Sequence, residues 1–311
     1  MTLDLFLQLL PQTLINGLTL GSVYALIALG YSMVYGILKL LNFAHGDIYM
    51  IGAYLGYGVF VMTVVDKQAL LPTAVIIILM LIVAMIGAGV VSIAVERFAY
   101  RPLRYAPRIA PLISALGVSF ILQNLTQITV SPRPLSYSSG VLIATDNKFA
   151  IGDLQVHASR LLVIGVALIL MFALTYFVTR TKLGRAMRAV SMDLDAAQMM
   201  GVNVNQVVLV TFFIGAVLAG AGGVLVGIVF FSIRHTMGLL AGLKGFTAAV
   251  IGGIGSIPGA ALGGLILGLA ESFLSVYVSI TFKDVWAFII LLIILLVRPT
   301  GLMGTPIIKK V

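Results

Sequence analysis

Cysteine is absent from this chain of 311 residues, and charged residues are scarce. The lack of cysteine excludes disulfides, thiolate metal sites and cysteine catalysis. Charged residues make up 9% of the sequence, against about 25% in a typical globular domain, whereas apolar residues make up 61%, against roughly 45–50%. A water-soluble protein could not bury this much apolar surface. The composition therefore predicts an integral membrane protein.

Several motifs that carry chemistry are also missing. The sequence has no G-x-x-x-x-G-K-[ST] loop for ATP, no G-x-S-x-G elbow and no H-E-x-x-H pair. Neither a catalytic residue nor a metal ligand is therefore predicted. The net charge of +9 does not indicate nucleic-acid binding, because no basic helix or patch of basic and aromatic residues accompanies it. In a membrane protein, such an excess of cations normally reports topology.

Long apolar runs predict an all-α bundle of about eight to nine membrane segments, folded as a single transmembrane domain over residues 1–311. The sequence shows no sustained alternation of apolar and polar residues, which excludes a membrane barrel. The expected spans are 14–37, 43–65, 70–95, 109–130, 161–178, 207–231, two helices within 238–278 that meet at 252–259, and 284–297.

The cations predict the orientation. Clusters at 96–108 and 180–188, together with Lys39, Arg298 and the two final lysines, hold twelve of the 19 Lys and Arg residues. Since cations concentrate on the cytoplasmic side, we expect the N-terminus outside and the C-terminus inside. The polar segment 131–160 is then an extracytoplasmic loop, and 180–205 is a cytoplasmic loop.

The cytoplasmic stretch RTKLGRAMRAVSMDLDAAQMMG (180–201) predicts a short helix over 191–201. Ser191 or Asp193 can cap it, and Asp195 suits the positive end of the helix dipole. Gly201 supplies a left-handed stop. Leu194, Ala197 and Gly201 are expected on one side, and Met192, Ala196 and Met199 on the other. The simpler alternative is a basic loop that happens to be helical.

A few polar residues fall inside or at the ends of the spans. Ionisable groups at membrane depth are costly and usually functional, and Glu271 is expected to be paired or to face an aqueous path. His45, Asp47 and Lys244 lie near expected helix ends, so they either serve the pathway or anchor at the interface.

Glycine is frequent, with ten glycines between residues 238 and 268. Spacings of four residues, as at Gly52 and Gly56, let helices approach closely in lipid. Irregular backbone at membrane depth is tolerated only where it faces protein or water, so two glycine-bearing turns are expected to line or gate a translocation pathway. The candidate pathway residues are Asn42, His45, Gly46, Lys244, Gly252, Gly253, Gly255 and Glu271.

An inverted repeat is also suggested by two similar segments. GDIYMIGAYLG (46–56) and GFTAAVIGGIG (245–255) each follow a long glycine-bearing helix and a short polar break. An odd number of crossings between the two copies would invert one relative to the other, as in many transporters.

Several long motifs resemble those of the branched-chain amino acid permeases of ABC importers. The resemblance is greatest to the shorter of that system's two permease subunits. DAAQMMG (195–201) is similar to the E-A-A-x-x-x-G loop of importer permeases, with Asp195 in place of Glu. The other matching segments are 16–54, 96–104, 111–124, 242–260 and 296–304. The loop 131–160 shows no matching pattern.

The resemblance implies a multi-pass protein of the bacterial inner membrane, in a complex with a second permease subunit, two cytoplasmic ABC ATPases and an external substrate-binding protein. ATP and magnesium are then held by the partners, and this chain binds no cofactor and is not itself an enzyme. The coupling residues implied are Asp193, Leu194, Asp195, Ala196, Ala197, Met200 and Gly201. The alternatives are a urea or short-amide permease of the same family, and an ATP-independent channel or secondary carrier.

Overall fold

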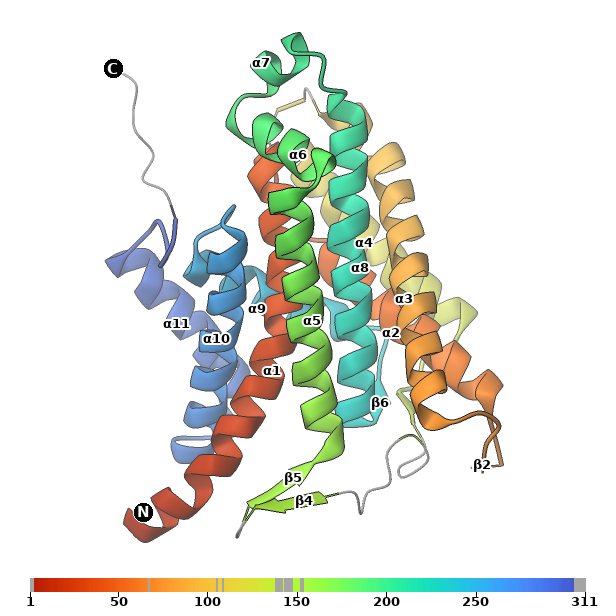
Figure 1. Cartoon of the computed structure of the whole chain (residues 1–311), viewed down its shortest axis with the longest axis vertical. Helices are drawn as coiled ribbons and strands as arrows, with labels where there is room; N and C mark the ends of the chain where they lie inside the picture. The colour runs from red at the N-terminus through yellow and green to blue at the C-terminus, as the bar shows by residue number, and fades with distance from the viewer. Residues whose placement is uncertain are drawn as a thin grey trace.

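Long apolar helices, most of them running along the length of the molecule, make up most of the chain (Figure 1). The structure is a computed structural model that describes residues 3–66, 68–104, 106–107, 109–137, 142, 148–151 and 154–304. Its α-helices are α1 (Leu3–Leu38), α2 (His45–Thr63), α3 (Thr73–Val95), α4 (Ile109–Thr129), α5 (Ala158–Arg180), α6 (Lys182–Met192), α7 (Leu194–Met199), α8 (Val204–Phe230), α9 (Met237–Gly252), α10 (Ile257–Tyr277) and α11 (Lys283–Val297).

Six of these helices are long and apolar enough to cross a membrane, namely α1, α3, α4, α5, α8 and α10. The helices α2, α9 and α11 are shorter, with 19, 16 and 15 residues. At 1.5 Å per residue, α11 extends about 22 Å, which is less than the roughly 30 Å of a bilayer core. The chain is thus a multi-pass membrane protein, and the expected eight to nine segments include helices too short to cross alone.

Several helix boundaries differ from the sequence prediction by one to three residues, and the start of the first helix differs by eleven. The first helix begins at Leu3 instead of residue 14 and carries Pro11 inside it. The third helix begins at Thr73 instead of residue 70, because Pro72 occupies the position before its first turn. Between α2 and α3, a small hairpin is formed by β1 (Val64–Val65) and β2 (Gln68–Ala69).

The helices α1–α4 and α8–α11 repeat one arrangement in opposite directions along the bundle (Figure 1). In each copy a long helix ends in a non-glycine residue with positive φ, at Lys39 (55°) and Phe231 (54°). A shorter helix then begins, at His45 and at Met237. The packing also corresponds. The first helix of each copy packs on the third helix of the other copy, α1 on α10 and α8 on α3. It also packs on the second helix of the other copy, α1 on α9 and α8 on α2.

The expected inverted repeat is therefore present, but the register predicted for it is wrong. The helix starts equate residue 45 with residue 237, whereas the sequence comparison equated residue 46 with residue 245. The two registers differ by seven residues, which is nearly two helical turns. A shift of that size keeps glycine and apolar positions in phase, so the sequence pattern could not separate the two registers.

The core lies along α1 and α8, whose most apolar windows are 72% buried, whereas those of α3, α4 and α5 are 28–33% buried. Glycines let the central helices approach closely. A Cβ atom at Gly52 of α2 would overlap the backbone of Gly220 in α8, and one at Gly268 of α10 would overlap Gly21 of α1. The outer helices leave large apolar side chains exposed, as lipid or a partner subunit requires.

Short strands cover the end of the bundle where α1 begins (Figure 1). A hairpin of β4 (Lys148–Ile151) and β5 (Leu154–His157) precedes α5. Nearby, β3 (Leu135–Ser136) pairs with β6 (Ser232–Ile233), which follows α8. The described part of the polar loop 131–160 therefore lies at the end opposite α6 and α7.

Candidate coupling helix and translocation residues

The stretch 180–201 forms two helices instead of the single helix predicted over 191–201. The first helix, α6, has Thr181 as its N-cap, and the Thr181 hydroxyl accepts a hydrogen bond from the Gly184 amide at 3.0 Å. It ends at Met192, and the backbone of the following residue, Asp193, is extended (φ −154°, ψ 113°). The break separates α6 from the six-residue α7, which lies at the far end of the molecule (Figure 1).

Asp193 is the cap of α7. Its Oδ1 accepts a hydrogen bond from the Ala196 amide at 2.9 Å. Ser191, the alternative cap, lies in α6 instead, and its hydroxyl donates to the carbonyl of Arg188 at 2.7 Å. Asp195 falls in the first turn of α7, as predicted.

Gly201 has φ +84°, which confirms the predicted left-handed stop after α7. Nothing lies within 4 Å of the position that a Cβ atom would take there. Glycine is therefore favoured by backbone conformation alone, because a left-handed conformation costs other residues roughly 1–2 kcal/mol. The chain turns at this point into α8, which Asn203 caps through the Gln206 amide at 3.1 Å.

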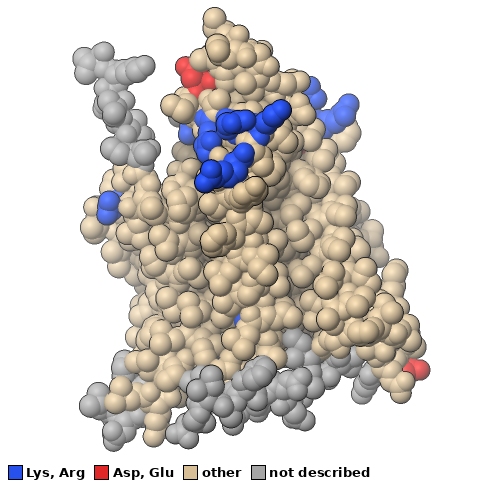
Figure 2. Space-filling model, viewed as in Figure 1, with Lys and Arg blue, Asp and Glu red and all other residues tan. Residues whose placement is uncertain are grey.

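The two sides expected for this helix differ in exposure. Met192, Met199 and Met200 are 89%, 88% and 84% exposed, whereas Ala197 is 5% exposed. Ala197, expected on one side with Leu194 and Gly201, packs inside the chain, whereas Met192 and Met199, expected on the other side, are exposed. Asp195 and Ala196 are exposed and Leu194 is partly buried. Figure 2 shows Lys and Arg side chains gathered at this end of the molecule.

The segment between α1 and α2 contains the first candidate pathway residues. Asn42 is 2% exposed, and its Oδ1 accepts a hydrogen bond from the Tyr100 hydroxyl at 2.8 Å. His45 is equally buried and meets the ring of Tyr31 edge-on, at 4.8 Å between centroids. Within the described residues, neither Asn42 Nδ2 nor His45 Nε2 has a hydrogen-bond partner. Anchoring of His45 at the interface is therefore wrong.

Asp47 is fully buried on the first turn of α2. Its carboxylate accepts hydrogen bonds from the Ser119 hydroxyl and, at 3.0 Å, from Gln123 Nε2. Both donors belong to α4, so Asp47 joins α4 to α2. Beside it, Gly46 lies against Gly238 of α9, where a Cβ atom would overlap the facing carbonyl. Asp47 is thus a buried structural acceptor instead of an interfacial anchor.

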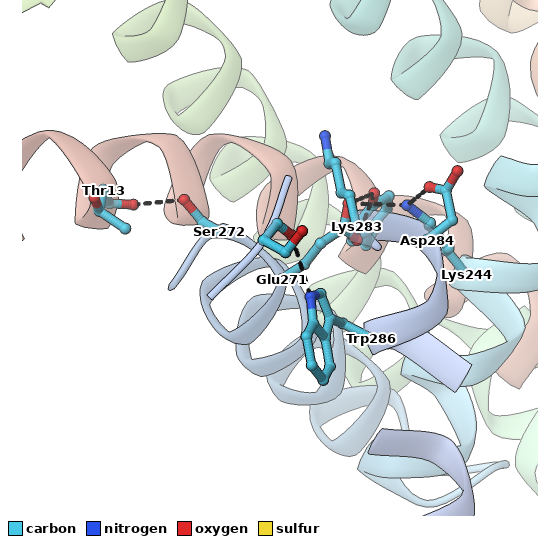
Figure 3. A network of polar contacts seen from close by, with 9 residues as sticks. Thr13, Lys244, Glu271, Ser272, Lys283, Asp284 and Trp286 are labelled. Atoms are coloured by element: carbon cyan, nitrogen blue, oxygen red, sulfur yellow. Dashed lines mark hydrogen bonds and ion pairs between the residues drawn. The ribbon is translucent and has the colours of Figure 1, made fainter. Parts of the chain in front are cut away.

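Lys244 and Glu271 form a buried ion pair, 2.8 Å from Nζ to Oε1 (Figure 3). The Tyr24 hydroxyl lies 3.0 and 3.2 Å from the two carboxylate oxygens of Glu271. Lys244 also pairs with Asp284 at 2.6 Å, and Lys283 approaches Glu271 at 3.5 Å. Of the alternatives for Glu271, the structure shows pairing. Lys244 is 5% exposed and does not reach water at an interface.

The turn between α9 and α10 holds the candidates Gly252, Gly253 and Gly255. Gly253 and Gly255 have φ of +103° and +95°. The backbone of the turn is paired with the end of the chain, since the amides of Leu302 and Met303 donate to the carbonyls of Ile251 and Gly252, both at 2.9 Å. The turn is thus packed against protein on this side.

A cavity of about 500 Å³ borders the turn and the segment after α1. It is lined by Tyr35, Lys39, Leu41, Phe246, Val250, Ile254, Leu295, Pro299, Thr300 and Gly304. Lys39 and Leu41 of the segment after α1 and Ile254 of the turn after α9 therefore line one space, although the candidate pathway residues themselves do not line it.

Sequence reasoning missed the partners of the buried charges. Ser119 and Gln123 stand four residues apart on an apolar helix, and that spacing was a signal that one face of α4 is polar. Tyr24 and Tyr100 carried no such signal. Among the described residues, no group of three or more His, Cys, Asp or Glu side chains could hold a metal ion.

The comparisons with known proteins agree with this architecture. The profile of a family described as "branched-chain amino acid transport system / permease component" matches residues 13–297. The chain belongs to this family. This permease is 43% identical to the high-affinity branched-chain amino acid transport system permease protein LivH of Escherichia coli, over 98% of this chain and 99% of that protein.

The permease protein BraD of Pseudomonas aeruginosa, from a system of the same description, is 42% identical, over 96% of this permease and 97% of BraD. A solved structure, PsaBC from Streptococcus pneumoniae in complex with Fab, matches with a TM-score of 0.50 and 15% identity, over 96% of this permease and 97% of that chain. At that identity the likeness concerns the fold alone.

Proposed function

We propose that this permease is the membrane subunit of an ATP-driven importer for branched-chain or related amino acids in the bacterial inner membrane. It forms the translocation pathway with a second permease subunit, receives substrate from an external binding protein, and is driven by two cytoplasmic ABC ATPases. The identity of 42–43% to LivH and BraD, over nearly the whole of each chain, supports the substrate class.

The proposed coupling to ATPases rests on the structure of the α7 region. A six-residue helix is built at the outermost point of the molecule, with a capping carboxylate at Asp193 and a left-handed stop at Gly201. It presents Met199 and Met200 almost fully to the outside. Exposed methionines adapt to an apolar groove on a partner. A channel that works alone has no use for such an element.

We further propose that Asn42, His45 and Gly46 border the route of the substrate, because they lie in or directly after the irregular segment 39–44, whose Lys39 and Leu41 line the 500 Å³ cavity. Lys244 and Glu271 neutralise each other within the chain. That pairing favours a role in holding α9 and α10 together over direct contact with a zwitterionic substrate.

The experiment that tests this function uses the complete complex, assembled from this permease and the partner subunits of its own transport system. Met199→Asp and Met200→Asp place a charge on the exposed side of α7 without touching a membrane helix. We expect weaker co-purification of the ATPases and loss of amino-acid-stimulated ATP hydrolysis. Gln68→Asp, an exposed change in the hairpin at the opposite end, serves as the control.

Two outcomes would contradict the proposal. If both methionine variants bind the ATPases and hydrolyse ATP like the wild-type complex, α7 is not the coupling helix. If the complex responds to urea or short amides and not to leucine, isoleucine or valine, the alternative substrate class is correct.

A further inference from the structure

The turn that follows α3 is irregular in a way that the sequence did not predict. Residues Glu96–Tyr100 form a π-helical turn, and Arg101–Leu103 continue it as a 3-10 helix. π-Helical turns are rare and occur frequently at functional sites. This turn lies at the same end of the bundle as α7 (Figure 1), in the basic cluster 96–108.

Arg104, directly after the turn, connects it to the start of α8. Its guanidinium donates to Asn205 Oδ1 at 2.7 Å and to Glu96 Oε1 at 2.9 Å. The Arg104 and Glu96 side chains are 11% and 2% exposed, so this pair is largely shielded from water. Charge-assisted hydrogen bonds of this kind are stronger than neutral ones. Asn205 lies four residues after Gly201, in the first turn of α8.

Arg104 also reaches the space beside α7. A polar cavity of about 340 Å³ is lined by Arg104, Leu194, Gln198 and residues 201–205. A partner subunit that docks on α7 would therefore act at the guanidinium that holds the π-helical turn.

At the other end of the same turn stands Tyr100, which is 2% exposed. Its hydroxyl donates to Asn42 Oδ1 at 2.8 Å, in the segment between α1 and α2. Its ring packs on Phe212 of α8 at 5.4 Å between centroids. The π-helical turn thus makes specific contacts both with the region around α7 and with a candidate pathway segment.

We propose that Arg104 and Tyr100 form a mechanical relay, through which movement of α7 and the start of α8 is transmitted to residues 39–44. The relay rests on the proposed coupling to ATPases. The path is short, because Arg104 bonds Glu96 at 2.9 Å, and Glu96 and Tyr100 are the two ends of a π-helical turn of five residues. Arg104 and Tyr100 act as positioning residues and do not themselves contact substrate.

The test uses a single cysteine as a reporter, which the cysteine-free chain permits once the partner subunits have been freed of cysteine. Leu41→Cys places a thiol in segment 39–44, at the 500 Å³ cavity. Its rate of modification by a maleimide is measured in the nucleotide-free and in the vanadate-trapped complex. We expect the two rates to differ in the wild-type background.

In that background, Tyr100→Phe removes only one hydroxyl, and Arg104→Gln removes the charge while keeping a polar side chain. Both variants should lose the dependence of the thiol rate on nucleotide. Substrate imported per ATP hydrolysed should fall by roughly 2- to 30-fold. The double variant should be no worse than the poorer single one, because both changes interrupt the same route. Arg101→Gln, an exposed change in the same turn, is the control and should behave as wild type.

The outcomes separate this proposal from the function on which it rests. A wild-type complex without amino-acid-stimulated ATP hydrolysis would overturn the importer function, and the relay with it. If stimulation is normal but both variants keep the nucleotide-dependent thiol rate and normal import per ATP, the importer stands and the relay is overturned. The relay is also overturned if a variant alters the thiol rate but leaves the difference between the nucleotide-free and the vanadate-trapped complex unchanged. That result indicates an effect on local packing only.

Discussion

The buried ion pair between Lys244 and Glu271 allows the most quantitative prediction. Lys244→Met keeps the length of the side chain and removes its charge, which leaves the fully buried Glu271 carboxylate without its nearest cation. Removing one partner of a buried pair costs about 3–5 kcal/mol. The lower end applies here, because Lys283 at 3.5 Å and the Tyr24 hydroxyl remain beside Glu271.

A loss of about 3 kcal/mol corresponds to roughly a hundredfold change in the unfolding equilibrium constant. Reversible unfolding of the purified subunit in mixed micelles with increasing SDS measures it directly. Lys244→Met/Glu271→Gln should recover most of the loss, because the double variant leaves no uncompensated charge in the interior. Lys283→Met, at a side chain 35% exposed, should cost much less than Lys244→Met.

A Lys244→Met variant that unfolds at the wild-type SDS concentration, or a double variant less stable than Lys244→Met alone, would contradict this stabilising role of the ion pair. The same variants also separate packing from transport. If the double variant is stable and assembled but transports nothing, the pair acts in the pathway as well as in the fold.

Three further predictions concern the helix contacts, the stop after α7 and the topology. Gly52→Ala should destabilise the bundle by about 1–3 kcal/mol, because its Cβ would overlap Gly220, whereas Gly58→Ala on the same helix meets open space and should be neutral in the same SDS titration. Gly201→Val should abolish amino-acid-stimulated ATP hydrolysis, because valine disfavours the positive φ of this position. Gly201→Asn should retain most of it, because asparagine tolerates positive φ. Equal ATP hydrolysis by the two variants would contradict the role of φ. An impermeant thiol reagent outside intact cells should label Gln68→Cys and not Met192→Cys, and the reverse pattern would invert the assigned orientation.

Features that depend on local sequence were predictable. The apolar runs located the helical segments, and Gly201 located the end of α7, because a left-handed stop depends mainly on the residue itself. The cap at Asp193 was one of two candidates, since serine and aspartate both suit the position. The tertiary fold decided between them by ending α6 at Met192.

Features that depend on distant packing were not predictable. Glu271 is 27 residues from Lys244 and 247 from Tyr24, and no local pattern joins them. His45 and Asp47 seemed close to an interface because a polar break precedes them, yet both are buried, and Asn42 of the break is buried with them. Ala197 seemed free to contact a partner. Helical spacing fixes which residues share a face, but it does not fix which face the rest of the chain covers.

We expect this permease to move branched-chain amino acids at the expense of ATP hydrolysed by its partners. The most direct test is uptake of radiolabelled leucine into proteoliposomes that contain the complete complex, with the binding protein outside and ATP inside. The account predicts uptake against a gradient that requires ATP and is lost in Gly201→Val. Leucine uptake that proceeds equally without ATP would contradict it, and would identify the chain as a channel or a secondary carrier.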